Sequence, residues 1–241
     1  MRRTVVVTGG SVGIGRAIAE RFVADGAEVV ITGRRADVLK ATAGEIGARG
    51  VVCDASDPDA VELAVAELPG RIDVLVNNAG GNTDLGRPDD DSLVEVAASW
   101  QANIAANVLS AVLTTTALAD RIALGGTVVL LGSIAADRGS RGGSYGAAKA
   151  ALAAWNVDLS AELGARGITS NVISPGFIAE TDFFRGRMTD ERRTTLHEAT
   201  RNKREGVPAD VAEAAFFLAS PGARHITGQV LNVNGGAFTT R

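Results

Sequence analysis

Short runs of valine, isoleucine and leucine alternate with helix-like segments along the chain, and this alternation limits the possible folds most strongly. The predicted strands are residues 5–7, 29–32, 51–53, 74–76, 127–131, 169–173 and 230–233. The predicted helices are residues 13–25, 36–46, 57–68, 93–124, 145–163 and 208–219. Apolar strands separated by helices are typical of a parallel sheet that is covered on both faces. The pattern therefore predicts an α/β protein with three layers, a doubly wound and mostly parallel sheet of seven strands between helices.

Length and composition fit one domain of this kind and argue against several functions. We expect residues 1–241 to form a single domain, because no repeat or linker-like segment interrupts the alternation. A formal net charge of −4 argues against general nucleic-acid binding, and no apolar run reaches the ~18 residues that span a bilayer. The single Cys53 and two histidines, His197 and His225, leave little material for a disulfide, a zinc site or a His-based triad. We expect a cytoplasmic protein that holds no metal.

A glycine-rich segment from Thr8 to Gly15 follows the first predicted strand and opens the first predicted helix. Gly9 would allow a sharp turn, Gly13 would let backbone amides approach a pyrophosphate, and Gly15 would let the helix pack closely on the sheet. The positive end of the helix dipole would attract phosphate. The segment therefore predicts a dinucleotide site, although a glycine-rich turn that binds nothing would look the same in isolation.

Tyr145 and Lys149 are four residues apart, so they share one face near the start of a predicted helix. The helix dipole and the lysine ammonium would both lower the pKa of the phenol from its free value of ~10. A phenol tuned in this way can give a proton to a carbonyl oxygen or take one from an alcohol. Ser133 ends the fifth predicted strand, where its hydroxyl could hold a substrate oxygen or simply cap a turn.

Five elements in this order resemble the short-chain dehydrogenase/reductase family. They are the Gly-x-x-x-Gly-x-Gly turn from Gly9, the Asn-Asn-Ala-Gly element at 77–80, Ser133 with the Tyr-x-x-x-Lys at 145–149, Pro175-Gly176, and the stretch 226–236. The resemblance implies a Rossmann-like fold and hydride transfer between a nicotinamide cofactor and a carbonyl or secondary alcohol. The resemblance implies that Tyr145 is the general acid/base, that Lys149 tunes it and binds the nicotinamide ribose, and that Ser133 binds the substrate oxygen. The chain is most similar to 3-oxoacyl-carrier-protein reductases, although the spacing from Pro-Gly to Thr181 is one residue longer than usual.

Two asparagines, Asn103 and Asn107, lie in the long predicted helix. In the family, a helix asparagine follows a tryptophan by seven residues, and counting from Trp100 selects Asn107. The resemblance gives Asn107 the fourth catalytic role, which is to hold a water molecule against the catalytic lysine. Asn103 is then expected to be an ordinary residue on the face of the helix.

The cofactor preference can be argued from charge. The second predicted strand ends at Gly33, where an NAD-binding fold usually carries an acidic residue that binds the ribose. Arg34 and Arg35 follow, and guanidinium groups suit a ribose 2′-phosphate, so we expect NADP(H). Arg35 could also be solvated, Arg16 could add positive charge, and Asp54 matches a family aspartate beside the adenine. The predicted cofactor-binding residues, several implied by the resemblance alone, are Gly9, Ser11, Gly13, Ile14, Gly15, Arg34, Arg35, Asp54, Asn78, Ala79, Gly80, Tyr145, Lys149, Pro175, Gly176, Ile178 and Thr181.

The substrate side is expected in residues 179–206, an irregular polar segment between the sixth strand and the last helix. Four apolar residues could line a pocket beside the nicotinamide or pack beneath a mobile flap, namely Phe177, Phe183, Phe184 and Met188. Between Arg185 and Arg204 there are seven Lys/Arg residues and three acidic residues. This excess could steer an anionic carrier such as acyl carrier protein or a CoA nucleotide, or it could be ordinary solvated surface.

Three functions remain open at this point. The first is an NADP(H)-dependent 3-oxoacyl thioester reductase of fatty acid biosynthesis, with a small or carrier-linked substrate. The second is an enzyme of the same family that acts on a sugar, steroid, polyketide or xenobiotic carbonyl. The third is a non-catalytic NADP(H)-sensing protein, which the complete set of Ser133, Tyr145 and Lys149 argues against. The resemblance also implies a homo-oligomer, either a tetramer or a dimer.

Overall fold

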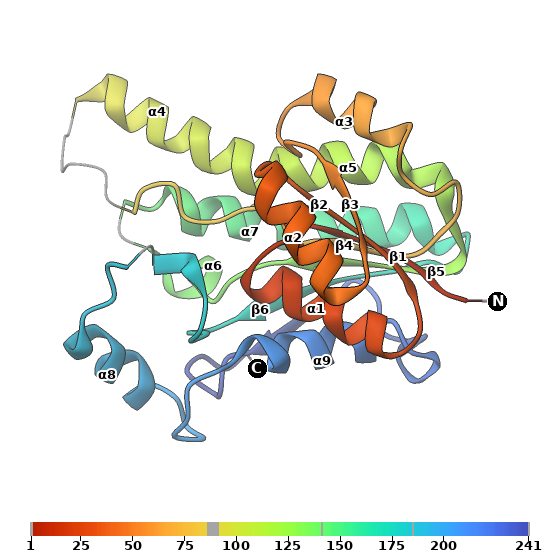
Figure 1. Cartoon of the computed structure of the whole chain (residues 1–241). Coiled ribbons are helices and arrows are strands. Elements are labelled where there is room, and N and C mark those ends of the chain that lie inside the picture. Colours follow the sequence, from red (N-terminus) through yellow and green to blue (C-terminus); the bar gives the residue numbers. More distant parts are fainter. Residues whose placement is uncertain (1, 86–91, 141, 185, 241) are drawn as a thin grey trace.

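The computed structural model describes residues 2–85, 92–140, 142–184 and 186–240, and it has the predicted three-layer α/β architecture (Figure 1). The strands are β1 (Thr4–Thr8), β2 (Glu28–Gly33), β3 (Arg49–Val52), β4 (Ile72–Asn77), β5 (Ile122–Leu131), β6 (Thr169–Pro175) and β7 (Val230–Val233). They form one seven-stranded sheet in the order β3-β2-β1-β4-β5-β6-β7, and each neighbouring pair is parallel. The predicted sheet is therefore confirmed. Its strand order reverses between β1 and β4, which is where a doubly wound sheet binds its ligand.

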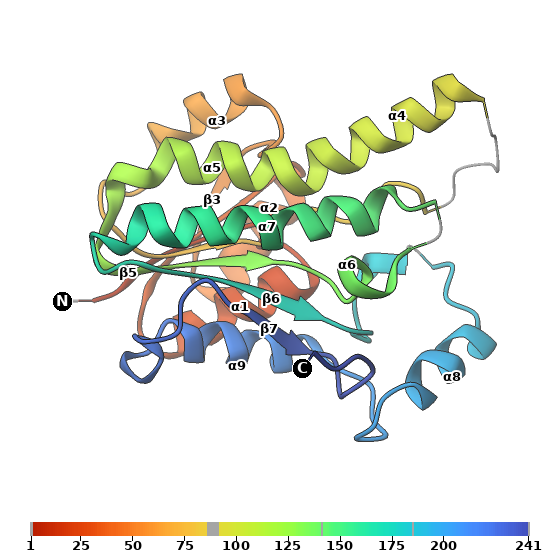
Figure 2. The same cartoon turned by 180° about the vertical axis from the view of Figure 1, so that it is seen from behind.

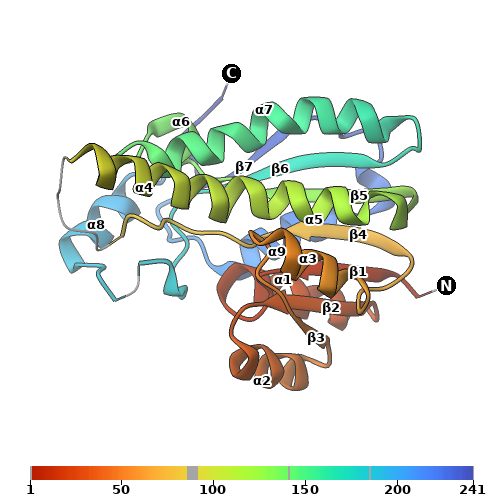
Figure 3. The ribbon, with the colours of Figure 1, turned by 90° about the horizontal axis from the view of Figure 1, so that it is seen from above.

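Helices cover both faces of the sheet (Figures 2 and 3). The α-helices are α1 (Gly13–Ala24), α2 (Ala36–Ile46), α3 (Pro58–Val65), α4 (Leu93–Ile104), α5 (Ser110–Leu118), α6 (Ala135–Arg138), α7 (Ser144–Gly164), α8 (Asp190–Glu198) and α9 (Pro208–Leu218). Short turns of other helix types are η1 (Ala105–Leu109), η2 (Ala119–Arg121), η3 (Asp182–Phe184) and η4 (Pro221–Ala223). Buried residues of α1, α2 and α9 pack on one face, and those of α3, α5 and α7 pack on the other.

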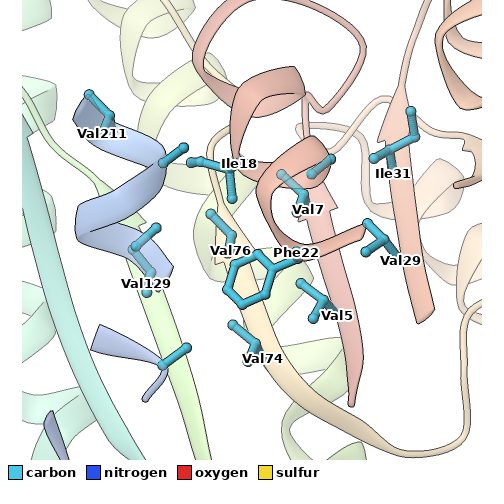
Figure 4. Packing of buried hydrophobic residues seen from close by; sticks show 14 of the residues in the cluster. Val5, Val7, Ile18, Phe22, Val29, Ile31, Val74, Val76, Val129 and Val211 are labelled. Carbon is cyan, nitrogen blue, oxygen red and sulfur yellow. The ribbon is translucent and has the colours of Figure 1, made fainter. Parts of the chain in front are cut away.

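The alternation of side chains along β1 explains why this strand is apolar throughout. Val5 and Val7 belong to the core on one face, while Val6 belongs to the core on the other, and all three are fully buried. On the first face the ring of Phe22 from α1 lies among Val5 and the valines of β4 (Figure 4). Because both faces of β1 are covered, apolar side chains fit its middle positions, and its polar residues Thr4 and Thr8 lie at its two ends.

The predicted helix at 93–124 is wrong at its C-terminal end, because residues 122–124 already belong to β5. The apolar residues of this stretch are compatible with a helix or a strand, and they form a strand because Ile122 pairs with Ile72 of β4. The helix itself is also interrupted, since η1 is a π-helical turn between α4 and α5. Such turns are rare and are often found at functional sites, and this one contains Asn107.

The helical stretch Leu93–Arg121 has a mean hydropathy of 1.4 over an 18-residue window and is long enough to cross a membrane. No such span was expected from the sequence, because polar residues are interspersed along it. The stretch packs on β4 through α5 and on α7 through α4, and Asn103 and Asn107 are buried in it. These contacts are those of a core helix, and we interpret it as one.

The segment 179–206 is more regular than expected, because it contains η3 and α8. Figure 1 shows α8 projecting beyond the sheet, on the same side as α6. An isolated parallel bridge between Ile178 and Gly206 ties the two ends of the segment together. The segment is thus a loop with a closed base beside the carboxyl ends of the strands.

Candidate active site

The glycine-rich turn has a backbone that only glycine fits well. Gly9 and Gly13 have φ angles of +63° and +53°, which side chains with a Cβ rarely adopt. A Cβ at Gly9 would lie 2.9 Å from Ala79 Cα, and one at Gly15 would lie 2.3 Å from both the Gly9 carbonyl oxygen and Asn78 Nδ2. The turn therefore presses against the end of β4 at the start of α1.

The Asn-Asn-Ala-Gly element joins the ends of the two central strands. The Thr8 hydroxyl accepts hydrogen bonds from the amides of Asn78 and Ala79, both at 3.0 Å. Asn78 Nδ2 donates to the carbonyls of Thr8 and Gly9, also at 3.0 Å. Gly80 lies against Asn107, because a Cβ there would be 2.6 Å from Asn107 Oδ1. This element holds β1, β4 and the glycine-rich turn in one arrangement.

Ser133, Tyr145 and Lys149 meet at the carboxyl ends of the strands. Tyr145 and Lys149, both on α7, are only 6% and 5% exposed. Ser133 faces the Tyr145 side chain closely enough to act on its pKa, and its Oγ accepts from the Ala135 amide at 3.1 Å. Ser133 thus caps a turn and faces the tyrosine at once, so the two interpretations of this residue do not exclude each other.

The buried head of Lys149 lies next to Tyr145. Its Nζ donates to the carbonyl of Leu131, the last residue of β5, at 2.7 Å and lies 5.9 Å from the centre of the Tyr145 ring. The lysine is therefore anchored to the sheet, and its position beside the phenol is fixed.

Burial dominates the ionisation of this pair. It raises the pKa of Tyr145 to about 12, against a smaller lowering by the Ser133 hydrogen bond, and it lowers the pKa of Lys149 to about 8. The expectation of a lowered tyrosine pKa is therefore wrong for this form of the protein, because desolvation outweighs the helix dipole and the nearby ammonium. At neutral pH Tyr145 is a neutral phenol, which is the form that donates a proton.

Three of the four predicted apolar residues form an aromatic cluster over Tyr145. The ring centre of Phe183 lies 5.8 Å from that of Tyr145 and 5.0 Å from that of Phe184, which in turn is 6.0 Å from Phe177. A Cβ at Gly13 would lie 3.5 Å from Thr181 Cγ2, so the same stretch also contacts the glycine-rich turn. Residues 177–184 therefore bridge the two halves of the crevice.

The two asparagines of the long helix are both buried, and the expectation that Asn103 is an ordinary helix-face residue is wrong. Asn107 Nδ2 donates to the carbonyls of Gly81 and Asn103, at 2.9 and 3.0 Å, and its Oδ1 accepts from the Gly81 amide at 2.9 Å. Asn103 Nδ2 donates to Ser144 Oγ at 3.0 Å, and its Oδ1 accepts from the Thr83 amide at 3.2 Å. Their four-residue spacing was the available signal that both face the same way.

The arginines near the predicted adenine ribose differ in how closely they are paired with acidic residues. The Arg34 side chain is 74% exposed, and its Nη1 lies 3.7 Å from Asp54 Oδ2. Burial acts to raise the pKa of Asp54, but hydrogen bonds from Ser56 and the charge of Arg34 outweigh it and lower that pKa. Arg16 is held by Glu20 at 2.8 Å and by Glu45 at 3.0 Å, so its charge is largely compensated. Arg34 is thus the freer of these two cations.

The Pro-Gly element closes the crevice after β6. A Cβ at Gly176 would lie 2.7 Å from Asn234 Cβ, so the chain passes close to the end of β7 at this point. Ile178 is buried, and the Ala179 amide donates to the carbonyl of Gly206 at 2.8 Å. Glu180 has a φ angle of +57°, which shows how the extra residue before Thr181 is accommodated as a local left-handed kink.

The basic excess of the segment is smaller than the count of residues suggested. Arg193 forms two hydrogen bonds with the carboxylate of Glu205, at 2.6 and 2.7 Å. Arg204 forms a similar pair with Asp210, with both distances at 2.7 Å. Both acids lie just beyond the residues that were counted, and Arg185 lies outside the described residues.

Known proteins are similar to this chain over nearly its whole length. Residues 9–238 match the family model described as enoyl-(acyl carrier protein) reductase. The 3-oxoacyl-[acyl-carrier-protein] reductase of Salmonella typhimurium is 37% identical over 247 aligned residues, which cover 98% of this chain and 97% of that protein.

Two solved structures match nearly the whole chain. A short-chain dehydrogenase from Burkholderia cenocepacia in complex with NADP is 36% identical, with a TM-score of 0.84, and the match covers 98% of this chain and 97% of that one. A 7α-hydroxysteroid dehydrogenase complexed with NADH and 7-oxo glycochenodeoxycholic acid is 30% identical, with a TM-score of 0.88 and coverage of 97% and 93%. The chain belongs to the short-chain dehydrogenase/reductase family, in which it resembles the 3-oxoacyl-carrier-protein reductases.

Proposed function

We propose that this protein is an NADP(H)-dependent oxidoreductase that reduces a carbonyl group or oxidises the corresponding secondary alcohol. The observation that carries the proposal is the buried Tyr145 beside the buried Lys149, with Ser133 facing the phenol, at the carboxyl ends of the central strands. The cradle at Gly9, Gly13 and Gly15, which a Cβ would fill or strain, fits a dinucleotide pyrophosphate at the start of α1.

The side chains supply binding and proton transfer. NADP(H), when bound, supplies or accepts the hydride. In the reducing direction, Ser133 holds the carbonyl oxygen and the neutral Tyr145 donates its hydroxyl proton to that oxygen. Lys149, with a pKa of about 8, can exist in both protonation states near neutral pH, so it can return a proton towards Tyr145 while it binds the ribose. Asn107, buried at the π-helical turn, completes the catalytic set by holding a water molecule against Lys149.

The choice of NADP(H) over NAD(H) depends on the end of β2. Gly33 provides no carboxylate that would repel a 2′-phosphate, and the exposed Arg34 is available to bind one. One solved relative is in complex with NADP and another with NADH, so membership of the family does not determine the cofactor preference. Arg34→Ala should weaken NADPH binding by about 10- to 150-fold, the range for one charged hydrogen bond, and leave NADH binding nearly unchanged. Equal effects on both cofactors would contradict the assignment.

For the substrate we propose a 3-oxoacyl thioester, supported by the similarity to 3-oxoacyl-carrier-protein reductases. The aromatic cluster of Phe177, Phe183 and Phe184 offers an apolar surface beside Tyr145 that suits an acyl chain. The likeness to a hydroxysteroid dehydrogenase favours a bulky apolar ketone as the second candidate. Oxidation of NADPH should be followed with 3-oxoacyl thioesters and with steroid and sugar ketones. Turnover of none of them, by a protein that binds NADPH, would favour a sensor over an enzyme.

A carrier-linked thioester would be steered by the positive charges of segment 179–206. Among the described residues of the segment, Arg187 and Arg192 are the exposed basic residues nearest to the aromatic cluster in sequence, whereas Arg193 is paired with Glu205. Replacing Arg187 and Arg192 together by Glu should lower kcat/KM for the carrier-linked substrate several-fold at low salt. At 0.1 M salt, where the Debye length is about 10 Å, steering is screened and the same replacement should have little effect. For a free neutral ketone, neither the charge reversal nor the change in salt should alter kcat/KM. Equal responses of the two substrates would show that the segment does not steer a carrier.

We further propose that the protein acts in the cytoplasm as a single-domain homo-oligomer, a dimer or tetramer, with residues 179–206 covering the substrate. Support for self-association comes from large apolar residues exposed on the outer side of α4 and η1. They are Leu93, Val94, Val96, Trp100 and Leu109. An exposed apolar strip of this kind is typical of a protein interface. Light scattering after size-exclusion chromatography should give a mass of two or four chains, and a monomer at micromolar concentration would contradict this.

A further inference from the structure

A cluster of four polar side chains lies at the start of α7, and one of its members directly precedes Tyr145 in the chain. We call Asp84, Ser99, Asn103 and Ser144 the Asp84 cluster. Asp84 accepts a hydrogen bond from Ser99 Oγ on Oδ1 and another from Ser144 Oγ on Oδ2, both at 2.5 Å. Asn103 Nδ2 donates to the same Ser144 hydroxyl at 3.0 Å. Ser144 is fully buried, so its hydroxyl has exchanged water for these partners.

The cluster joins three separate pieces of chain. Asp84 belongs to the loop after β4, Ser99 and Asn103 belong to α4, and Ser144 is the first residue of α7. Asn103 Oδ1 also accepts from the amide of Thr83, the residue before Asp84, at 3.2 Å. The carbonyl of Asn103 accepts from Asn107 Nδ2, so the hydrogen bonds run without a break from Asp84 to Asn107.

The first turn of α7 is supported by side chains from outside the helix, and one of them, Ser140 Oγ, accepts from the Gly146 amide at 2.9 Å. The N-cap position of α7 is Gly143, at a φ angle of +77°, which provides no side-chain cap. A helix start leaves backbone amides without partners, and a negative charge there is stabilised by the helix dipole. Asp84 Oδ2 lies 3.7 Å from where a Cβ of Gly142 would be, so the carboxylate sits against this helix start as well as on Ser144.

We propose that Asp84 is a positioning residue that acts through Ser144 to hold the first turn of α7, and with it Tyr145, in the place required for proton transfer. The proposal rests on the function proposed for Tyr145. A general acid must lie within hydrogen-bonding distance of the oxygen it protonates, and a displacement of about 1 Å can reduce the rate about 100-fold. Ser144 is bonded directly to the backbone of Tyr145, so the carboxylate controls that displacement without touching the substrate.

Four variants separate positioning from general stability. Asp84→Ala and Ser144→Ala each remove the bond that reaches α7. Ser99→Ala is the matched control, because it removes a bond of the same length to the same carboxylate, together with a longer contact of 3.2 Å to Ser144 Oγ, but leaves the Asp84–Ser144 bond intact. Asp84→Asn is the rescue variant, because its amide can accept from Ser144 through oxygen and donate to Ser99 through nitrogen.

Turnover and cofactor binding should then diverge. Asp84→Ala and Ser144→Ala should each lower kcat by roughly 10- to 100-fold while the Kd for NADPH changes less than about twofold. Their double variant should be little worse than either single variant, because both remove the same link. Ser99→Ala should stay within about threefold of wild type, and Asp84→Asn should recover most of the loss in kcat. If Asp84→Ala does not fold, Ser144→Ala against Ser99→Ala decides the matter alone.

Hydrogen exchange provides a readout that needs no turnover. The amides of Gly146 and Ala147, in the first turn of α7, should exchange faster in Ser144→Ala and Asp84→Ala than in Ser99→Ala. The proposal is overturned if Ser99→Ala is as damaging as Ser144→Ala, or if Asp84→Ala lowers only the melting temperature and leaves kcat unchanged. If the wild type turns over no carbonyl, the proposed function fails, and the exchange pattern still shows whether Asp84 holds the start of α7.

Discussion

The cofactor side of the crevice is made chiefly of backbone, and the substrate side is made chiefly of side chains. On the cofactor side, the amides around Thr8 and the glycines Gly9 and Gly15 set a shape in which a single added carbon at either glycine would collide with the main chain. On the substrate side, the aromatic rings of residues 177–184 and the ion pairs of Arg193 and Arg204 set the shape. Backbone cannot move locally without moving whole strands, whereas side chains can rearrange or be replaced. The first side therefore suits a constant ligand, and the second suits a variable one.

Among changes that compare the two sides, the largest effect is expected from breaking the rigid cofactor side. In Gly15→Ala the new Cβ would lie 2.3 Å from the Gly9 carbonyl oxygen, so the turn must shift. Such overpacking costs roughly 1–3 kcal/mol, and the amides that would hold the pyrophosphate move with the turn. NADPH affinity, measured by fluorescence titration, should fall by up to about 150-fold.

The control for this change is Gly44→Ala in α2, where an added Cβ meets nothing within 4 Å. This substitution should raise the free energy of unfolding by about 0.4–1 kcal/mol and leave NADPH binding unchanged, because alanine restricts the unfolded chain. Similar losses in the two variants would show that the crevice is not sensitive to backbone position in particular.

An intermediate effect is expected from Lys149, which lies where the two sides meet. Burial lowers its pKa to about 8 from an unfolded value of 10.5. Between these two values the unfolded chain binds the proton and the folded chain does not, so the free energy of unfolding should rise with pH from about 8 to 10. The rise should be at most about 3 kcal/mol, and denaturation of the cofactor-free protein with urea measures it.

Lys149→Met should remove this rise while it keeps most of the buried volume. Above pH 10 the raised pKa of Tyr145 acts in the opposite direction, because the folded state then holds the proton that the unfolded state loses. A stability that falls steadily from pH 8 to pH 10 in the wild type, or the same rise in both proteins, would contradict the burial of the ammonium.

The smallest effect is expected on the variable side. Phe183→Ala removes the ring that covers Tyr145 but leaves every hydrogen bond of the catalytic residues in place. The space opened should raise the ratio of kcat/KM for a bulky ketone to kcat/KM for a small one by about tenfold, the change in selectivity expected when one side chain that lines a pocket is removed. Phe216→Ala, on α9 away from the crevice, is the control and should leave that ratio unchanged. If Phe183→Ala leaves the ratio unchanged too, the ring packs under a flap and does not line the substrate pocket.

The same contrast explains what could be predicted from the sequence. The strands, the glycine-rich turn and the pairing of Tyr145 with Lys149 are local in the chain, so spacing and periodicity were enough to find them. The end of the long helix was mistaken because apolar residues 122–124 suit both a helix and a strand, and pairing with β4 decides.

The direction of the Tyr145 pKa and the role of Asn103 could not be predicted, because both depend on burial by distant segments. Glu205 and Asp210 compensate the basic segment from positions just outside it, which a count of charges within the segment misses. The links of Asp84 to Ser99 and Ser144 span 15 and 60 residues of sequence, and no short pattern marks them.

The most direct test of the account is turnover by Tyr145→Phe, a change that removes one hydroxyl and keeps the ring under Phe183. With NADPH and the best carbonyl substrate at pH 7, kcat should fall by about 10²- to 10⁴-fold, the contribution of general acid catalysis, while the Kd for NADPH stays nearly unchanged. Turnover within tenfold of the wild type would contradict the assignment of Tyr145 as the proton donor, and with it the central claim about this crevice.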